Sequence, residues 1–580
     1  MKPGARTFLL LLLIYLSSVF VRLGGFDQAS AQPYPIYYSE GASHYYFIRT
    51  LVDTGSLPEV DLKMQYPEGF NIFSRTPVLF YYLSAVYSLV CAKFGLGLYP
   101  SLLLLPPLIY CVTVFTVYSV SRGLFGSELG ALFSAALYGF SMASVSRSTI
   151  AHLLYENMAL PLLFLHVLFL FKALDAVASK GMLFYASLSG LFLFTALSSW
   201  FVSGFYFAVL VACGSLLYFT SMRWDLRFYS VFGILTLSVF AAHNVFPFLS
   251  KQPIYLYLAF ALSASVVISN RARFGTLKAV LAYALILAFF MIGARPDPDF
   301  SHVYSVFEAK VLHLNKWYPN MPYEVRMTWV SGYLSPSLDN ITLFSIILPF
   351  GLISLAAIIS SWFRIYLKPQ VKLAALLAIA FALLFLMAVR LSVFTIFFLS
   401  TLCAYAVALA EKKFPSILGH IRVILIGIVL VEFGLGYYLT TSANYTLHPD
   451  VAGMLDYVRA NTSDDAVVLS SYFESPMVEV YAGRKILLNP FWENAQLRRK
   501  VGFFDRLLFE GESDYWSTLW KYDVQLVAYN RGLCEGAPPF VGEKPQDGSF
   551  IKSLCSEDAD SSLFFVDYGN PSYFLIKPIP

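Results

Sequence analysis

Charged side chains are scarce in this chain. Asp, Glu, Lys and Arg make up only 13% of its 580 residues, whereas about a quarter of the residues of a soluble protein are charged. An ordinary soluble globular protein is therefore excluded. The net charge of +4 is small, so it does not indicate a nucleic-acid partner.

Several motifs of familiar catalytic mechanisms are also missing. The sequence has no Gly-rich phosphate loop, no His-Glu-x-x-His and no Cys-x-x-Cys. A Gly-x-Ser-x-Gly nucleophile elbow is absent as well. The mechanisms that depend on these motifs therefore find no support in the sequence.

Apolar side chains dominate instead: 58% of the residues are hydrophobic, and the mean hydropathy is +0.65. Apolar runs of about 17–22 residues recur from the N-terminus to about residue 440, and each can cross a bilayer as a helix. Lipid offers no partner to backbone N–H and C=O groups, so each span must be helical. The sequence therefore predicts an α-helical polytopic membrane protein.

Thirteen of these runs are predicted to be transmembrane helices. They cover residues 7–23, 99–120, 127–145, 157–176, 181–198, 200–220, 229–247, 253–269, 276–294, 341–362, 371–388, 391–410 and 419–440. No small-x-small cleavage site closely follows the first run, so we interpret it as a retained span rather than a signal peptide. A shorter run at 77–90, rich in Tyr and Ser, is predicted to be an interfacial helix beneath the first outer loop.

The Lys and Arg residues support thirteen spans rather than fourteen. With thirteen, the basic residues collect in one set of loops, which the positive-inside rule places on the cytoplasmic side. With fourteen, they would scatter over both faces. The N-terminus is therefore predicted to be cytoplasmic. The loops 24–98, 146–156 and 295–340 and the tail then lie on the extracytoplasmic or lumenal face.

The composition changes after about residue 440, where apolar runs shorten and Asp, Glu, Asn and Gly return. The tail contains segments typical of buried strands, at 467–469, 485–488 and 524–528, and of amphipathic helices, at 451–459 and 496–508. We therefore predict a transmembrane domain, 1–440, and a small soluble α/β domain, 441–580. Cys534 and Cys555 lie in this exported part, where a disulfide is favoured, although the sequence leaves the pairing open.

Candidate functional residues collect on the predicted outer face. They are Glu40, His44 and Arg49 in the first loop, Arg147, His152, Glu156 and Asn157 around the second, Asp297, Asp299, His302, Glu308 and Lys310 in the long loop, and Arg390 between two spans. Interface loops are normally polar, and most such residues are merely solvated. Four segments that bring carboxylates, Arg or His to one boundary nevertheless favour a common site.

These residue types suit chemistry on a lipid-borne phosphate. A carboxylate near the low-dielectric edge can act as a general base with a raised pKa. An arginine beside it can hold a phosphate through paired donors. The combination predicts an enzyme that takes a phosphate-linked group from a membrane lipid. His302 with Asp297 and Asp299 is an alternative metal site, although no fixed spacing supports it.

The first outer loop resembles that of the GT-C glycosyltransferases, multi-span enzymes that use polyprenyl-phosphate sugar donors. The most similar branch is the protein C-mannosyltransferases, which attach mannose to tryptophan from dolichyl phosphate mannose. Their first loop has the form Glu-x-Gly-x-x-Tyr-x-Tyr-Phe-Lys-Thr. Residues 40–50 keep the spacing from Glu40 to Arg49 and the aromatic run, while the glycine is displaced by one position, to Gly41.

Further short stretches are similar to the same branch. They are 154–161, with Glu156 before a proline, 299–303 with Lys310, 482–490 and 493–498. The resemblance implies that Glu40 is the catalytic base, that Glu156 and His302 line the pocket, and that Arg390 faces the lipid phosphate. We add as candidate substrate-binding residues His44, Arg49, Arg147, His152, Asn157 and Glu308. The resemblance also implies a lipid-phosphate sugar and a protein acceptor as partners, and no metal cofactor.

Two alternatives remain open. The oligosaccharyltransferase catalytic subunit has the same architecture and requires a divalent metal, but its Trp-Trp-Asp-Tyr-Gly hallmark is missing from the tail. Ser43 also stands where its metal-binding Asp would be. Sugar transfer to another lipid or to a cell-wall acceptor belongs to the same alternative. A transporter is the rival of another class, although the candidate charges cluster at one face rather than at mid-membrane.

Overall fold

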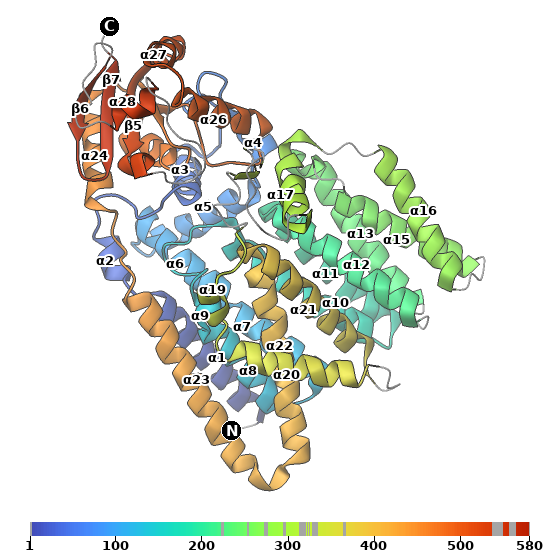
Figure 1. Cartoon of the computed structure of the whole chain (residues 1–580). Coiled ribbons are helices and arrows are strands. Elements are labelled where there is room, and N and C mark those ends of the chain that lie inside the picture. Colours follow the sequence, from blue (N-terminus) through green and yellow to red (C-terminus); the bar gives the residue numbers. More distant parts are fainter. Residues whose placement is uncertain are drawn as a thin grey trace.

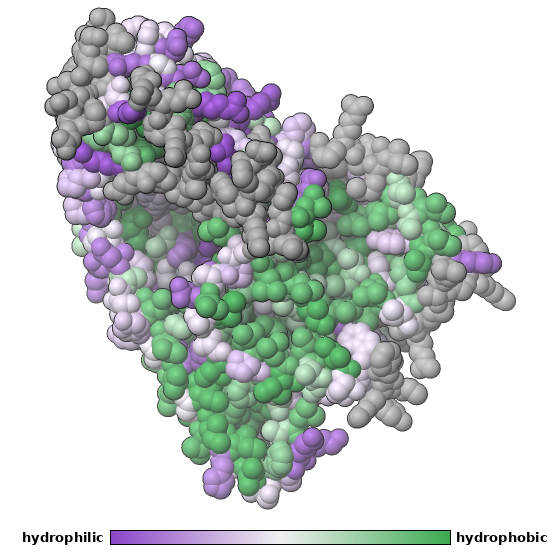
Figure 2. All heavy atoms as spheres, viewed as in Figure 1, coloured by the Kyte–Doolittle hydropathy of each residue, from purple (hydrophilic) through white to green (hydrophobic). Residues whose placement is uncertain are grey.

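The computed structural model consists of a large helical bundle with a small sheet at one end (Figure 1). It describes residues 3–221, 226–251, 254–271, 276–293, 297–312, 321, 323, 325–326, 334–362, 367–535, 549–555 and 564–578. Figure 2 shows hydrophobic residues over much of the bundle surface and hydrophilic residues gathered at the sheet end. The molecule is therefore divided as expected for a chain with one part in lipid and another in water.

Eight helical stretches among the described residues are long and apolar enough to cross a membrane. They comprise α1 (Pro3–Arg22), α6 (Leu98–Cys111) with α7 (Thr113–Phe125), α10 (Tyr155–Asp175), α11 (Ser179–Ser199), α12 (Val202–Ser221), α21 (Pro369–Met387), α22 (Ser392–Lys413) and α23 (Leu418–Thr441). The polytopic helical fold is thus confirmed.

The other predicted spans coincide with apolar helices outside this set of eight. These are α8 (Glu128–Phe140), α13 (Leu226–Val245), α15 (Ile254–Arg271), α16 (Thr276–Gly293) and α20 (Ile347–Ser360). The number of thirteen spans stays a prediction. The run 127–145 is not one helix, because α8 ends at Phe140 and α9 (Met142–Val145) begins after Ser141, which has extended backbone and caps α9 through its hydroxyl.

Two pairs of helices that are neighbours in the sequence pack together, α10 on α11 and α15 on α16. Helix α11 also packs against α13, and α22 packs against α8, α20 and α21. The last helix, α23, lies along α1, α8 and α9 and leaves most of its surface exposed. Gly436 permits this approach, since a Cβ atom there would lie 2.6 Å from the carbonyl oxygen of Phe140. The first and last helices of the bundle therefore lie side by side (Figure 1).

The first region predicted as an outer loop is largely helical. It contains α2 (Phe26–Ser30), α3 (Glu40–Thr54), a hairpin of β1 (Val60–Asp61) and β2 (Phe70–Asn71), α4 (Ile72–Arg75) and α5 (Leu79–Ala92). The stretch from Glu40 to Arg49, expected as loop, forms the first ten residues of α3. This helix ends at Gly55, whose φ of +80° terminates it without strain. The predicted helix at 77–90 is α5, which packs against α3 and α6.

The tail contains a five-stranded sheet with the order β4-β3-β5-β7-β6. Its strands are β3 (Val467–Ser470), β4 (Lys485–Ile486), β5 (Val524–Asn530), β6 (Phe564–Gly569) and β7 (Tyr573–Pro578), and its helices include α24 (Pro449–Asn461), α25 (Ser475–Met477), α26 (Ala495–Leu507), α27 (Glu512–Lys521) and α28 (Phe550–Leu554). β3 pairs in parallel with β4 and β5, whereas β7 is antiparallel to β5 and β6. The three predicted strands and both predicted helices are present, and Cys534 and Cys555 form a disulfide.

The tail and the first region are joined through the backbone. The N–H of Ile486, in edge strand β4, donates to the carbonyl of Lys63 at 2.8 Å, and the N–H of Tyr66 donates to the carbonyl of Ile486 at 2.9 Å. The hydroxyl of Tyr481 also donates to the carbonyl of Tyr37 at 2.9 Å. The sheet edge is therefore extended by a segment more than four hundred residues earlier in the chain.

Arg22, the last residue of α1, is fully buried and bonded only to neutral groups among the described residues. Its Nε donates to the hydroxyl of Ser148 at 2.7 Å and its Nη2 to that of Ser144 at 2.8 Å. Its Nη1 donates to the carbonyls of Gly139 at 2.7 Å and Ser18 at 3.0 Å. Arg22 thus holds the segment after α8 against α1.

Arg22→Met should lower the free energy of unfolding by about 3 kcal/mol, because the Gly139 carbonyl and two hydroxyl groups lose their buried donor. The midpoint of thermal unfolding in detergent measures the change. Arg6→Met, at an exposed position of the same helix, should leave that midpoint unchanged. Equal midpoints for the two variants would contradict a structural role for Arg22.

Candidate active site

Glu40 opens α3 at the end of the bundle where the sheet lies. The preceding residue, Ser39, has a φ of +50°, so the chain turns sharply into the helix. The free N–H groups of a helix's first turn favour a negative charge. The side chain of Glu40 is 27% exposed, and its Oε1 lies 3.5 Å from Nε2 of His44, one turn further along and fully buried. The carboxyl group of Glu40 is therefore accessible to solvent, and the helix N-terminus favours its negative charge.

Aromatic residues surround His44. The hydroxyl of Tyr81, on α5, lies 3.3 Å from its Nδ1 and 2.5 Å from the hydroxyl of Tyr155, the first residue of α10. The rings of Tyr155 and Phe80 have centroids 4.1 Å and 5.3 Å from that of His44. The imidazole thus links Glu40 to a chain of hydroxyl groups, and its orientation is set by packing.

Glu156, the second residue of α10, connects two arginines. Its Oε1 accepts from Nη2 of Arg147 at 2.5 Å, and its Oε2 lies 3.7 Å from Nε of Arg390. Glu156 is 1% exposed, whereas Arg147 and Arg390 are 29% and 20% exposed. Both guanidinium groups therefore present a solvent-accessible surface beside a buried carboxylate.

These charges also act on Glu40. Burial by itself would raise the pKa of Glu40, but the hydrogen bond and charge of His44, and then the charges of Arg390 and Arg147, lower it below its ordinary value. Burial lowers the pKa of His44, more than the neighbouring Glu40 raises it. At neutral pH Glu40 is therefore an ionised carboxylate beside a neutral imidazole.

Glu493, in the segment between β4 and α26, is a member of this cluster that was not among the predicted site residues. Burial and then the charge of Glu40 raise the pKa of Glu493 to about 7, against weaker opposite effects that include Arg390 and Arg498. Its only sequence signal was its place in the stretch 493–498, which resembles the C-mannosyltransferase tail. Tyr81 was missed for a different reason, because it lies in an apolar run.

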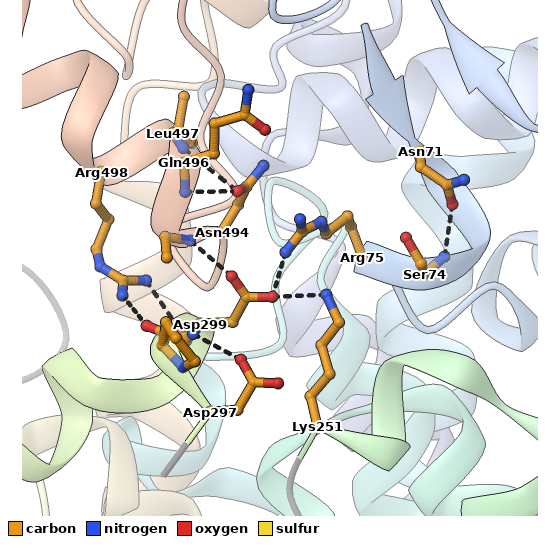
Figure 3. A network of polar contacts seen from close by, with 12 residues as sticks. Asn71, Ser74, Arg75, Lys251, Asp297, Asp299, Asn494, Gln496, Leu497 and Arg498 are labelled. Carbon is orange, nitrogen blue, oxygen red and sulfur yellow. Dashed lines mark hydrogen bonds and ion pairs between the residues drawn. The ribbon is translucent and has the colours of Figure 1, made fainter. Parts of the chain in front are cut away.

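Asp299 is the centre of a second polar network (Figure 3). Its Oδ2 accepts from Arg75, on α4, and from Nζ of Lys251 at 2.6 Å. Its Oδ1 accepts from the N–H of Ala495, at the start of α26, at 2.8 Å. The guanidinium of Arg498 donates to the carbonyl of Asp299 at 2.8 Å. These contacts join four segments that are far apart in the sequence.

The cations of this network lower the pKa of Asp299. Burial alone would raise it, but the hydrogen bonds from Lys251 and the Ala495 N–H and the charge of Arg75 outweigh burial. His302, on α17 (Ser301–Leu312), is buried beside this network, and burial and then Arg498 lower its pKa to about 3. His302 is therefore neutral at neutral pH.

The structure brings together Glu40, His44, Arg147, Glu156 and Arg390 from the predicted set. His152 lies near Arg147. Burial and then the charge of Arg147 lower the pKa of His152 to about 3. Its carbonyl accepts from the amide of Asn157 at 2.5 Å, so this pair shapes the turn before α10.

Arg49 and Glu308 do not join the cluster. Arg49 lies nine residues after Glu40, about 13 Å along α3 and on its opposite face. Its guanidinium donates to the carbonyl of Val480 at 3.4 Å, which holds α3 against the π-helical segment η4 (Val478–Ala482). Glu308 is exposed on α17. Polar residues are spread throughout the predicted outer loops, so the sequence did not distinguish Arg49 and Glu308 from the residues that meet in the cluster.

The described residues do not fit the metal site that the oligosaccharyltransferase alternative implies. Among them, no group of three or more His, Cys, Asp and Glu side chains is arranged to hold a metal ion. Glu156 is paired with arginines and Asp299 with Arg75 and Lys251. Ser43 offers no carboxylate. We derive no step through a metal.

No family model and no curated protein matches the sequence. Solved structures of the Archaeoglobus fulgidus oligosaccharyltransferase do match. The apo form has a TM-score of 0.74 at 14% identity, over 91% of this chain and 70% of that chain. AglB from the same organism, with an inhibitory peptide and a dolichol-phosphate, has a TM-score of 0.72 at 14% identity, over 91% and 69%.

This chain has the GT-C fold. A third structure of the archaeal enzyme, tethered to an acceptor peptide with the NVT sequon, agrees, with a TM-score of 0.68 at 14% identity over 92% of this chain and 70% of that chain. At such identity the likeness establishes the GT-C fold and leaves the reaction to the site itself. Helix α3, which begins with Glu40, lies at the end of the bundle that carries the small sheet (Figure 1).

Glu156→Gln should lower the free energy of unfolding by about 2 kcal/mol, because Arg147 and Arg390 would face each other without the carboxylate between them. The change is measured as a lower midpoint of thermal unfolding. Glu128→Gln removes a carboxylate that is 45% exposed and pairs with Arg122, and it should change the midpoint by less than about 0.5 kcal/mol. A midpoint for Glu156→Gln equal to that of the Glu128 variant would contradict the bridging role.

Proposed function

We propose that this protein is a membrane glycosyltransferase that moves a sugar from a polyprenyl- or dolichyl-phosphate donor to a protein acceptor. The observation that carries the proposal is the partly exposed carboxylate of Glu40 beside the pair of arginines that Glu156 holds. A base and an anion-binding group side by side at the end of a transmembrane bundle are what this reaction requires.

The transfer step follows from the chemistry of the donor. The acceptor's nucleophilic atom attacks C1 of the sugar, and the C1–oxygen bond to phosphate breaks. Arg390 and Arg147 stabilise the phosphate that leaves as an anion. Glu40 removes the proton that the acceptor loses. His44 holds the Glu40 carboxylate through its neutral imidazole.

We infer mannose as the sugar and tryptophan as the acceptor from the sequence resemblance at 40–50, 154–161 and 482–498. In the fold these three stretches meet. α3 begins with Glu40, α10 begins one residue before Glu156, and the third stretch supplies Glu493. Segments that resemble one branch in the sequence and come together in space support that branch over a chance match.

Oligosaccharide transfer to asparagine is the second candidate. It is favoured by the similarity to the archaeal oligosaccharyltransferase, whose structures include one with dolichol-phosphate and one with an NVT acceptor peptide. It is opposed by the missing tail hallmark and by Ser43 in place of the metal-binding Asp. No observation in the structure favours transport.

We propose that the sheet end of the molecule faces the extracytoplasmic or lumenal side, with the N-terminus in the cytoplasm. The distribution of Lys and Arg among the loops supports this orientation. The acceptor would then be a protein on that side of the membrane. A cysteine-accessibility measurement with a membrane-impermeant reagent at an introduced Glu59→Cys would label intact vesicles of the outward orientation only.

The two candidates differ in donor and acceptor. Purified protein would be incubated with dolichyl phosphate mannose and a peptide containing Trp-x-x-Trp, or with a lipid-linked oligosaccharide and a peptide containing Asn-x-Thr. We expect a single-hexose mass increase on tryptophan in the first reaction and none on asparagine in the second. Modification of asparagine alone would overturn the assignment of mannose and tryptophan.

Glu40→Gln should lower sugar transfer by about 10²- to 10⁴-fold, because the amide cannot accept the proton. Initial rates at saturating donor measure the loss, and an unchanged melting temperature shows that the fold is kept. Glu59→Gln, an exposed carboxylate of the same region, should transfer at the normal rate. Full activity in Glu40→Gln would show that another group is the base.

A further inference from the structure

The turn that carries Arg390 is bound by a short segment of the region predicted as the long outer loop. Arg390 lies in this turn, between α21 and α22. The N–H of Val389 donates to the carbonyl of Leu334 at 2.8 Å. The hydroxyl of Ser335 donates to the carbonyl of Met387 at 3.3 Å. Two consecutive residues of the loop region therefore hold the backbone that leads to Arg390.

Lys310, on α17, binds the same segment through its side chain. It is 3% exposed, and its Nζ donates to the hydroxyl oxygen of Ser335 at 3.0 Å. An ammonium group can only donate and a carbonyl can only accept, so the Ser335 hydroxyl directs its own proton at the Met387 carbonyl. The three groups form a chain of hydrogen bonds with a single direction, in which each bond strengthens the next.

The side chain of Arg390 depends on its backbone for two further contacts. Its guanidinium carbon lies 5.8 Å from the ring centroid of Phe201, the residue before α12. That ring lies 6.3 Å from the ring of Phe300, the residue before α17. On another side, the Nε of Arg390 lies 3.7 Å from Oε2 of Glu156. A displacement of the turn would therefore separate the guanidinium group from both neighbours.

The stability of α17 does not explain why residue 310 is a lysine. Moving an ammonium group out of water costs free energy, whereas an apolar side chain would be buried there at a gain. What the lysine supplies is a charged donor, whose hydrogen bond is about twice as strong as a neutral one. Its acceptor is a hydroxyl group whose own bond ends three residues before Arg390.

We propose that Lys310 is a positioning residue that acts through Ser335 on the turn of Arg390, and thereby sets where the phosphate of the donor is bound. This inference rests on the phosphate-binding role of Arg390 in the proposed function. Lys310 is buried and does not itself contact the donor. Its charge orients the Ser335 hydroxyl, which holds the Met387 carbonyl and the backbone that leads to Arg390.

The first test compares the two substrates. Lys310→Met should raise the KM for dolichyl phosphate mannose about tenfold, because Arg390 loses its fixed position, while the KM for the Trp-x-x-Trp peptide changes less than about twofold. A variant that merely unfolds more readily would lose kcat and keep both KM values. Lys521→Met replaces an exposed lysine at the end of α27 and should match the wild type. An unchanged KM for the donor in Lys310→Met would overturn the proposal.

A double variant tests whether Lys310 acts through Ser335. Ser335→Ala is a small change at a half-buried position and should raise the KM for the donor about fivefold. Adding Lys310→Met to Ser335→Ala should raise that KM less than about twofold further, because the hydroxyl group that transmits the effect is already absent. Effects of the two substitutions that multiply in full would contradict the path through Ser335.

Hydrogen exchange needs no substrate and so separates this inference from the proposed function. The N–H of Val389 should exchange about fivefold faster in Lys310→Met and in Ser335→Ala than in the wild type, because the turn opens more often. Mass spectrometry of a peptide that spans residues 386–392 measures the rate, with Lys521→Met as the control.

Equal exchange rates in Lys310→Met and the wild type would refute the positioning role. Faster exchange in Lys310→Met, together with a wild-type protein that transfers no sugar from a lipid phosphate, would refute the proposed function. The link between Lys310 and the turn of Arg390 would then stand on its own.

Discussion

The placement of one buried carboxylate, Glu156, between two arginines is the constraint on which the centre depends. Arg147 comes from the turn before α10 and Arg390 from the turn before α22. Without Glu156 these guanidinium groups would repel each other across a low-dielectric edge. With it, both guanidinium groups are held beside Glu40, and their positive charges lower the pKa of its carboxyl group. The ion pairs thus hold two segments that are distant in the sequence together beside Glu40.

The helical architecture could be predicted well because it follows from a strong physical requirement. Apolar runs of sufficient length must be helical in lipid, and the structure has helices at each predicted run. The break at Ser141 could not be foreseen, because it arises from a local cap whose sequence is common within spans. The strands β6 and β7 were missed since their pairing depends on β5, at a distance along the chain.

The candidate site was predictable in part and for a similar reason. Glu40, His44, Glu156 and Arg390 stand out as charges beside apolar runs, and they do meet. Arg49 stood out equally but faces away, because the stretch around it is helical and places it on the opposite face of α3. Charged residues at a membrane boundary therefore indicate that a site is present. Which of them belong to the site depends on the local backbone conformation, because it decides the direction of each side chain.

The pairing of Ile486 with the segment around Lys63, and the packing of Phe491 on α3, have a consequence for biosynthesis. A ribosome reaches Glu493 about 450 residues after Glu40, which at about 5–20 residues per second takes about 20–90 s. Throughout that time α3 lacks the segment that completes the centre. The surroundings of Glu40 are therefore completed only when translation is nearly over.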